Sequence, residues 1–397
     1  MRIDGSEGGP LPLEAYIDSF LDAQRGAGYS PTTLAQRRSM AIAFARWTQT
    51  EHIADDGLDE GQVSRFVKRR PPRTDTAKER ATARRFLAHL RLQGVLPWLE
   101  SRPGSPVDAL AARYVTFLHE ERGFAENSIL VYAPSARDFL TYRVAHAGTL
   151  DLETLDAETI RTFLLGRIVD QSSESSRLLT VALRSFLRFL FLRGETPRDL
   201  SSAVPAIRTY RLKGVPAVLS PGEVEQVLST PDRSTIRGRR DHAILLLLAR
   251  LGLRASEVVS LELGDLRWRT GEIVVRGKGP RVDCLPLLTD VGHAVAEYLR
   301  QDRRATTSRR VFLRLIPPYV GLTRPCAIDH IVRLALSRAA VPPRRRHVAH
   351  LFRHSLATRM IRHGASIAEI AEVLRHRSQS TTAIYAKISF EANHPGK

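Results

Sequence analysis

The sequence predicts a mainly α-helical protein with a small β-hairpin or sheet in its C-terminal part. Hydrophobic residues recur at helical spacing along the N-terminal half, as at Leu183, Phe186, Leu187 and Leu190. Around residue 278, two short stretches with β-branched residues instead flank a Gly-Lys-Gly turn, which is typical of a hairpin. With 397 residues, of which 43% are hydrophobic, the chain can form two or three domains with cores of their own.

We interpret the N-terminal half as an internal repeat. Residues 28–34 resemble residues 123–129, and Phe44 matches Phe139 at the same offset. Further on, the segment 84–87 resembles the segment 184–187, and Gly94 matches Gly194. Each copy would cover roughly 90 residues of helix and loop, a reasonable size for a small helical domain. The alternative is a pair of unrelated helical bundles.

These patterns divide the chain into five expected parts. They are a flexible tail at 1–10, a helical domain at 11–98 (copy 1), a helical domain at 103–198 (copy 2), a linker at 199–216 and a C-terminal domain at 217–397. The linker is predicted from Pro205, Gly214 and Pro216, because proline and glycine favour turns and loops.

Helix-end signals predict the first elements of the C-terminal domain. Ser220, Pro221 and Glu223 have the residue types and spacing of an N-cap, a first helical position and a capping box. A buried helix is expected over 241–251, and Gly252 is expected to end it in a left-handed turn. Arg254, two residues after Gly252, would therefore lie just past the end of this helix, on a segment anchored by the apolar residues before it.

A hairpin and a further helix are expected later in this domain. The strands are predicted at 272–275 and 281–285, with Lys278 at the tip of the hairpin. Ser366 and Glu369 form a second capping-box pattern, which predicts the start of a helix leading toward His376.

Charge and composition limit the classes of binding partner and the cellular compartment that we expect for this protein. A formal net charge of +18 and a pI near 10.7 favour a polyanion, with nucleic acid first and an anionic membrane surface second. The longest apolar run, 243–249, is far shorter than the roughly 20 residues that cross a bilayer. Residues 1–10 lack the apolar core of a signal peptide. Cys284 and Cys326 are the only cysteines, so neither a disulfide framework nor a zinc site is expected, and we predict a cytoplasmic, nucleoid-associated protein.

The C-terminal domain also carries polar residues suited to phosphodiester chemistry. They are Arg254, Lys278, His350, Arg353, His376 and Tyr385. Guanidinium groups bind phosphate oxygens in pairs of hydrogen bonds, imidazoles exchange protons near neutral pH, and a tyrosine can act as a nucleophile. Lys278 stands out because the 60 basic residues are mostly arginines, and only lysine readily gives up a proton. Each residue alone has an ordinary structural explanation, such as a helix-end cation or a half-buried aromatic.

The order of these six residues resembles the catalytic pattern of the tyrosine recombinase family, also called the phage integrase family. That pattern is Arg, Lys, His-x-x-Arg, His or Trp, then Tyr, and the resemblance runs from about Leu219 to Ser389. It implies a C-terminal tyrosine-recombinase catalytic domain preceded by helical, SAM-like DNA-binding modules. Residues 103–198 resemble the family's core-binding domain, whereas residues 11–98 have no place in the minimal family plan.

The resemblance also implies a reaction. Tyr385 would attack the phosphodiester and form a 3′-phosphotyrosyl link, while Arg254 and Arg353 stabilise the charged phosphorus centre. His350 would act as general base or donor, His376 as a donor to a phosphate oxygen, and Lys278 as the acid that protonates the leaving 5′-oxygen. No metal, ATP or other cofactor would be needed. The implied partners are double-stranded DNA, a homotetramer on paired DNA sites and, in some systems, accessory recombinases.

Two other functions remain open at this level. A type IB-like topoisomerase would use the same cleavage but rejoin the same strand. A site-specific DNA-binding protein that has lost catalysis would keep the fold alone, although the complete six-residue set argues against it.

Some positions outside the six are also predicted to matter. Glu257 is expected to support Arg254, and Arg375 replaces the glycine that usually precedes the second histidine, so it is expected to alter the local chain path or to contact phosphate. Basic clusters are candidate phosphate contacts that position a protein without reading sequence. The candidates are Lys68, Arg69, Arg70 and Arg73, then Arg237, Arg239 and Arg240, then Arg344, Arg345 and Arg346.

Overall fold

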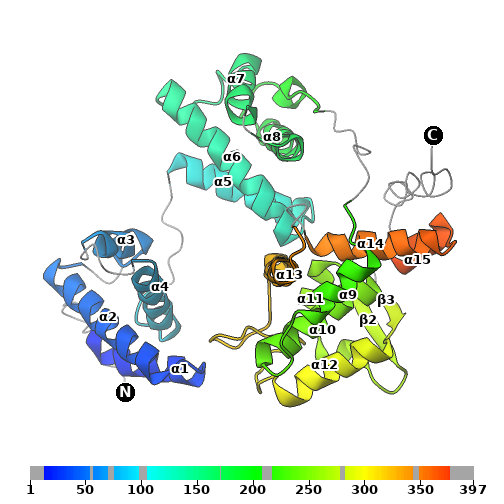
Figure 1. Cartoon of the computed structure of the whole chain (residues 1–397). Coiled ribbons are helices and arrows are strands. Elements are labelled where there is room, and N and C mark those ends of the chain that lie inside the picture. The colour runs from blue at the N-terminus through cyan, green and yellow to red at the C-terminus, as the bar shows by residue number, and fades with distance from the viewer. Residues whose placement is uncertain are drawn as a thin grey trace. The chain divides into compact units, whose positions relative to one another are not determined.

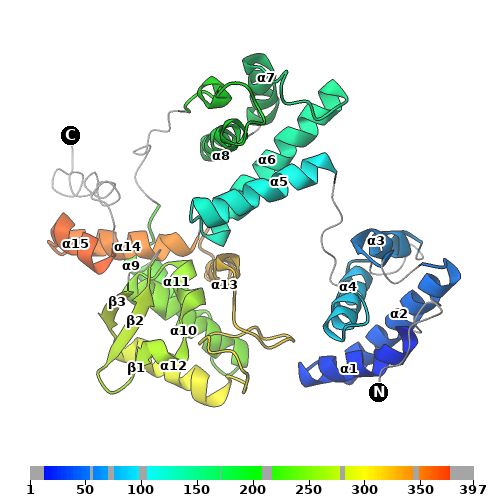
Figure 2. The ribbon, with the colours of Figure 1, turned by 180° about the vertical axis from the view of Figure 1, so that it is seen from behind.

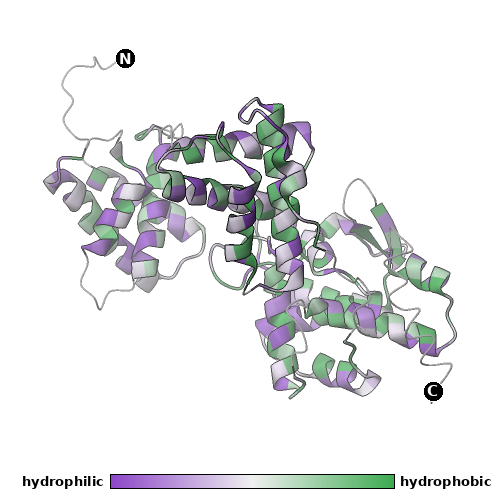
Figure 3. Ribbon diagram, turned by 90° about the horizontal axis from the view of Figure 1, so that it is seen from above, coloured by the Kyte–Doolittle hydropathy of each residue, from purple (hydrophilic) through white to green (hydrophobic). Residues whose placement is uncertain are grey.

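The computed structural model confirms a mainly helical chain with one small sheet (Figure 1). It describes residues 13–53, 57–69, 76–97, 105–169, 171–207, 217–277, 282–342 and 348–375. Hydrophilic and hydrophobic residues alternate along the helices in all parts of the chain, as expected of helices with one buried face (Figure 3). Within the described residues, no helix is both long and apolar enough to cross a membrane.

The first part of the chain forms helices around an aromatic core. The elements are η1 (Leu13–Tyr16), α1 (Ile17–Gly26), α2 (Pro31–Thr50), α3 (Glu60–Lys68) and α4 (Thr76–Leu92). The side chain of Ser30 caps α2, and that of Asp59 caps α3. Phe20, Phe44 and Phe86 are fully buried, and the rings of Phe20 and Phe86 lie 5.2 Å apart between centroids. These rings tie α1, α2 and α4 into one small bundle.

The second part forms a compact unit over Trp98–Arg211. Its elements are α5 (Pro106–Thr116), η3 (Phe117–Glu121), α6 (Glu126–Ala147), α7 (Ala157–Ile168), α8 (Ser173–Leu192) and η4 (Leu200–Ala203). Ser105, Asp156 and Ser172 cap α5, α7 and α8. A second hydrophobic core, separate from the first, runs from Leu110 to Val204.

Positions matched by the sequence repeat have the same local structure in both parts. Gly94 and Gly194 both adopt a φ of 70°, and each follows the last turn of a helix. Phe86 and Phe186 are both fully buried, and so are Phe44 and Phe139. The correspondence therefore extends from residue type to backbone conformation and burial.

The C-terminal part is built around a central helix. Its helices are α9 (Pro221–Ser229), α10 (Ile236–Leu251), α11 (Ala255–Ser260), η5 (Leu263–Asp265), α12 (Thr289–Gln301), α13 (Pro325–Arg338), α14 (Ala349–Arg362) and α15 (Ile367–Val373). Helix α10 contacts α9, α11, α12, α13 and α14. Most of its apolar residues are buried, and Ile244, Leu245, Leu247 and Leu248 are fully buried.

Three antiparallel strands, labelled in Figure 2, complete this part in the order β1-β2-β3. They are β1 (Leu266–Arg267), β2 (Glu272–Arg276) and β3 (Val282–Pro286). The register pairs Ile273 with Leu285 and Val275 with Asp283, which confirms the predicted hairpin. The two-residue strand β1 is an addition, because so short a strand has no alternating pattern in the sequence.

The predicted helix ends in this part are confirmed, with one shift. Ser220 and Ser366 each form a capping box, and Gly252 ends α10 with a φ of 58°. Helix α10 begins at Ile236 rather than at 241, because the Thr235 side chain accepts a hydrogen bond from the backbone N–H of Gly238 and starts the helix earlier.

Candidate active site

Arg254 lies at the corner between α10 and α11. The buried helix α10 fixes the start of the corner, and Gly252 reverses the chain there. Arg254 then acts as the N-cap residue of α11, with its side chain 32% exposed. A partly exposed guanidinium on a rigid corner can reach a bound phosphate while its backbone stays fixed.

Glu257 holds Arg254 in two ways. Its carboxylate accepts a hydrogen bond from the Arg254 backbone N–H at 2.8 Å and another from the Arg254 guanidinium at 2.6 Å. The Glu257 side chain is only 3% exposed. The contact that the sequence predicted for this pair is therefore present, and it limits the directions in which the guanidinium can point.

Arg353 is buried inside α14. One of its terminal nitrogens donates to the carbonyl of Gly252 at 2.6 Å, and the other donates to the carbonyl of Leu374. Gly252 follows α10, and Leu374 is the C-cap residue of α15. The guanidinium thus satisfies carbonyls at two helix ends, where intrahelical donors are missing.

Arg254 and Arg353 meet at the same short segment. Arg254 donates to the carbonyl of Arg375 at 3.4 Å, next to the Leu374 carbonyl that Arg353 contacts. The following residue in the sequence is His376. The structure therefore brings two of the six predicted residues together directly before the position of a third.

His350 lies on the first turn of α14, three residues before Arg353, and is exposed. Its ring centroid is 6.2 Å from that of His354. One helix therefore carries both His350 and Arg353, with the first open to solvent and the second buried.

The other three predicted catalytic residues are Lys278, His376 and Tyr385, and they lie outside the described residues. So do the predicted phosphate contacts Arg70, Arg73, Arg344, Arg345 and Arg346. Among the residues that the structure does describe, no cluster of three or more His, Cys, Asp or Glu side chains could hold a metal ion.

Some basic residues proposed as phosphate contacts have other partners. Lys68 is exposed at the end of α3, but Arg69 pairs with Glu51. Arg239 pairs with Asp302 at 2.5 Å and is mostly buried, while Arg240 is buried and pairs with Asp241 at 2.6 Å. The expectation for Arg239 and Arg240 was therefore wrong. Both side chains pair with carboxylates of the protein itself and so stabilise the first turns of α10. Arg237 in the same cluster is exposed.

Arg375 is a site residue whose role the sequence did not predict. Its side chain is 3% exposed and donates to Glu257 at 2.9 Å, on the other oxygen from the one that the Arg254 guanidinium contacts. Of the two alternatives expected for Arg375, an altered chain path or a phosphate contact, the second was wrong, because the guanidinium is buried against this carboxylate. The only sequence signal was the departure from glycine before His376, which gives the position but not the partner.

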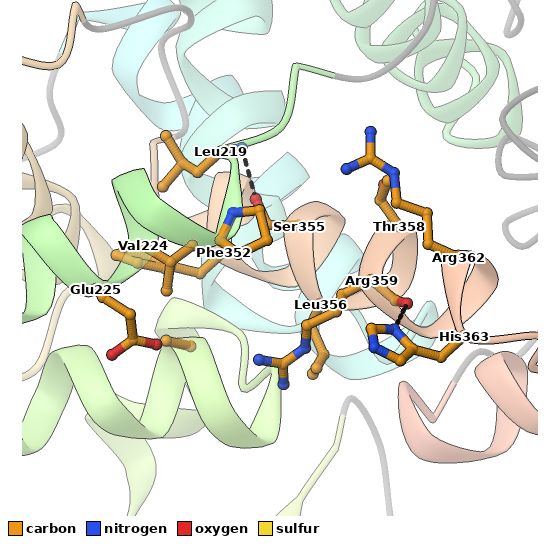
Figure 4. A pocket seen from close by; sticks show the side chains of 12 residues that line it. Leu219, Val224, Glu225, Phe352, Ser355, Leu356, Thr358, Arg359, Arg362 and His363 are labelled. Carbon is orange, nitrogen blue, oxygen red and sulfur yellow. Dashed lines mark hydrogen bonds between the residues drawn. The ribbon is translucent and has the colours of Figure 1, made fainter. Parts of the chain in front are cut away.

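A pocket lies on another face of α14 (Figure 4). Phe352, Leu356 and Arg359 line it together with residues of α9, and the hydroxyl of Ser355 accepts a hydrogen bond from the Leu219 backbone at 2.7 Å at its edge. None of the predicted site residues that the structure describes lines this pocket.

Two family models match separate parts of the chain. A model of the phage integrase family matches residues 217–392, and a model of the phage integrase N-terminal SAM-like domain matches residues 111–194. The chain is 37% identical to the integrase/recombinase y4rA of Sinorhizobium fredii, over 96% of this chain and 93% of that protein. The chain belongs to the phage integrase family.

More distant relatives agree with this membership. The tyrosine recombinase XerD of Listeria monocytogenes is 31% identical over 70% of this chain and 93% of its own length. Among solved structures, a lambda integrase tetramer bound to a Holliday junction matches with a TM-score of 0.51 at 16% identity, over 75% of this chain and 88% of that one. The chain is thus a tyrosine recombinase by sequence, and the structural match supports its fold.

Proposed function

We propose that this enzyme is a site-specific DNA recombinase of the integrase or transposase type that works through a 3′-phosphotyrosyl intermediate. The observation that carries the proposal is that Arg254 and Arg353 converge on the carbonyls of Arg375 and Leu374, directly before His376. The six-residue order of the family is complete in this chain, with Tyr385 as its last member.

Each residue has a role that fits its chemistry. Arg254 and Arg353 stabilise the negative charge that develops on the phosphate oxygens, which is usually the largest contribution to such catalysis. Tyr385 attacks phosphorus and its proton goes to His350, while Lys278 gives a proton to the departing 5′-oxygen. His376 donates a hydrogen bond to a phosphate oxygen. Because the phosphodiester energy is kept in the covalent link, a second 5′-hydroxyl can complete the transfer.

Double-stranded DNA is the proposed partner, bound by a homotetramer on paired sites. The lambda integrase relative was solved as a tetramer on a Holliday junction, which supports this assembly by analogy of fold. Charge supports it too, because most of the formal net charge of +18 falls on residues 217–397, whereas acidic and basic residues nearly balance over 103–198.

The proposed domain division follows the sequence repeat and the separate cores. Residues 103–198 would be the core-binding domain, 199–216 the linker and 217–397 the catalytic domain. Residues 11–98 would be an additional helical domain of the same kind as the core-binding domain, since matched positions share burial and backbone conformation.

A plasmid with two copies of a target site tests this function. Candidate sites are inverted repeats in the DNA that flanks the gene, and the products are read on agarose gels. A recombinase deletes or inverts the segment between the sites. Relaxation of supercoils without any exchange of flanks would instead indicate a topoisomerase, and binding without either product would indicate a protein that has lost catalysis.

A further inference from the structure

Glu257 is shared between two arginines. One carboxylate oxygen accepts from the guanidinium of Arg254 at 2.6 Å, and the other accepts from the guanidinium of Arg375 at 2.9 Å. The second oxygen also accepts the backbone N–H of Arg254 at 2.8 Å. A single buried carboxylate thus connects the N-terminus of α11 to Arg375, which lies two residues after the last residue of α15.

This cluster is buried enough for its charges to depend on each other. The side chains of Glu257 and Arg375 are each 3% exposed, while that of Arg254 is 32% exposed. A buried ion is stable only when it is paired and hydrogen-bonded, since it has lost its water. Arg375 is therefore the fully buried counter-ion of Glu257, and Arg254 is the member that remains open to a ligand.

Arg375 has an unusual backbone conformation for an arginine. Its φ of 53° lies in the left-handed region, where glycine is the residue without a steric penalty. An arginine at this position bears the steric penalty of the left-handed backbone, and its side chain makes the buried contact with Glu257. Its carbonyl also accepts the hydrogen bond from Arg254, so residue 375 contacts the Arg254–Glu257 pair through both backbone and side chain.

We propose that Arg375 is a positioning residue for Arg254. By occupying one oxygen of Glu257 from the interior, it keeps the carboxylate ionised and leaves the other oxygen to orient the Arg254 guanidinium toward the scissile phosphate. The inference rests on the proposed function, in which Arg254 binds that phosphate. Arg375 itself does not bind the phosphate, because its guanidinium is buried.

Loss of the Arg375 side chain should change the pH dependence of cleavage. Burial of the Glu257 carboxyl opposes its ionisation, but the charge of Arg375 and the hydrogen bonds and charge of Arg254 outweigh burial and hold its pKa below the ordinary value. Arg254 faces the carboxyl from α11 and Arg375 from the end of α15. Without Arg375 the pKa rises, so Glu257 becomes protonated at a higher pH and releases Arg254. The acid limb of the cleavage profile then moves to higher pH.

The test compares Arg375→Gly, Arg375→Ala and Arg375→Lys in the full-length protein. Single-turnover cleavage of a nicked target duplex is measured across pH, and duplex affinity is measured separately. A small misplacement of a catalytic group costs up to about 100-fold, so we expect a loss of roughly 10- to 100-fold in cleavage for Arg375→Gly, with affinity nearly unchanged. Arg375→Lys keeps a positive charge and should restore the acid limb toward that of the unchanged protein.

Two controls separate this inference from the function on which it rests. Arg375→Gly relieves the left-handed backbone, so any loss it shows comes from the missing side chain. In a Glu257→Gln background the carboxyl cannot titrate, and replacing Arg375 should no longer move the acid limb. If Arg375→Gly folds poorly, the positioning role is still tested by Arg375→Lys and by the Arg375 substitutions made with and without Glu257→Gln.

Wild-type cleavage and an unmoved acid limb in Arg375→Gly, together with inactive Arg254→Ala, would overturn the positioning role alone. Full cleavage by Arg254→Ala would instead overturn the phosphate-binding role of Arg254, and with it the proposed function. An unmoved limb in Arg375→Lys combined with a shifted limb in Arg375→Gly supports the proposal.

Discussion

The first helical part of the chain and the C-terminal part use arginine in different ways. In residues 13–97 most arginines with assigned partners lie at the surface and pair with acidic side chains. Examples are Arg38 with Asp18, Arg46 with Glu14 and Arg84 with Glu60. In the C-terminal part, Arg240, Arg353 and Arg375 are buried, and all three donate to backbone carbonyls.

Burial distinguishes the arginines whose side chains are held in one position from those that are not. An exposed ion pair contributes about 0–1 kcal/mol and can be exchanged with little effect. A buried guanidinium has lost its water and depends on charged or polar partners in the protein, so its position is specified by the fold around it. In a chain with 60 basic residues, composition cannot make this distinction, whereas burial and backbone acceptors can.

Replacing Arg353 should have the largest effect. Arg353→Ala removes a charged donor from the site and leaves the carbonyls of Gly252 and Leu374 without their partner. We expect cleavage of a nicked target to fall by about 10²- to 10³-fold, as for the loss of one transition-state donor. The matched control is Arg46→Ala in the first part. Equal activity in the two variants would contradict the comparison.

Removing a buried ring should cost about the same in either helical part. Phe86→Ala and Phe186→Ala each open a fully buried site and should lower the free energy of unfolding by about 3–5 kcal/mol. Hydrogen exchange read by mass spectrometry should localise the first loss to residues 13–97 and the second to residues 105–207. Loss of protection spread over both parts after one substitution would show that the two cores are not independent.

Gly252 should be more sensitive than another glycine of similar backbone. A methyl group at Gly252 would meet Leu374 at 2.9 Å and Leu356 at 3.0 Å, whereas one at Gly271 meets open space. Both have positive φ, 58° and 66°, so both alanine variants pay the left-handed penalty. We expect a loss of about 1–2 kcal/mol for Gly271→Ala and about 2–4 kcal/mol for Gly252→Ala, measured by urea unfolding. Similar losses would mean that the packing behind Gly252 yields easily.

The smallest effect is expected at an exposed pair of the first part. Arg46 and Glu14 lie 3.2 Å apart with side chains 72% and 42% exposed. Arg46→Ala should therefore change the free energy of unfolding by less than about 1 kcal/mol, and the difference should shrink further in high salt. A larger, salt-independent loss would place Arg46 with the buried arginines.

The parts of the fold that the sequence predicted are those fixed by neighbouring residues. The caps at Ser220 and Ser366, the turn at Gly252 and the hairpin each depend on a few adjacent side chains or on a local pattern. Burial of Phe186 followed from helical periodicity in the same way.

The parts that could not be predicted depend on contacts between distant residues. Arg375 and Glu257 are 118 residues apart in sequence, and nothing local indicates that their side chains meet. The same holds for Arg239, which reads as one of a basic cluster until the fold brings Asp302 beside it. Sequence order identified the candidate catalytic residues, but the partners that orient Arg254 required the structure.

The central claim is that this chain cleaves DNA through Tyr385, and one measurement tests it directly. The full-length protein is incubated with a nicked duplex of its target site, which traps the cut strand, and the products are separated on a denaturing gel. We expect a protein–DNA band that survives SDS in the unchanged protein and is absent in Tyr385→Phe, with DNA binding retained in both. A covalent band of full strength in Tyr385→Phe would contradict the account.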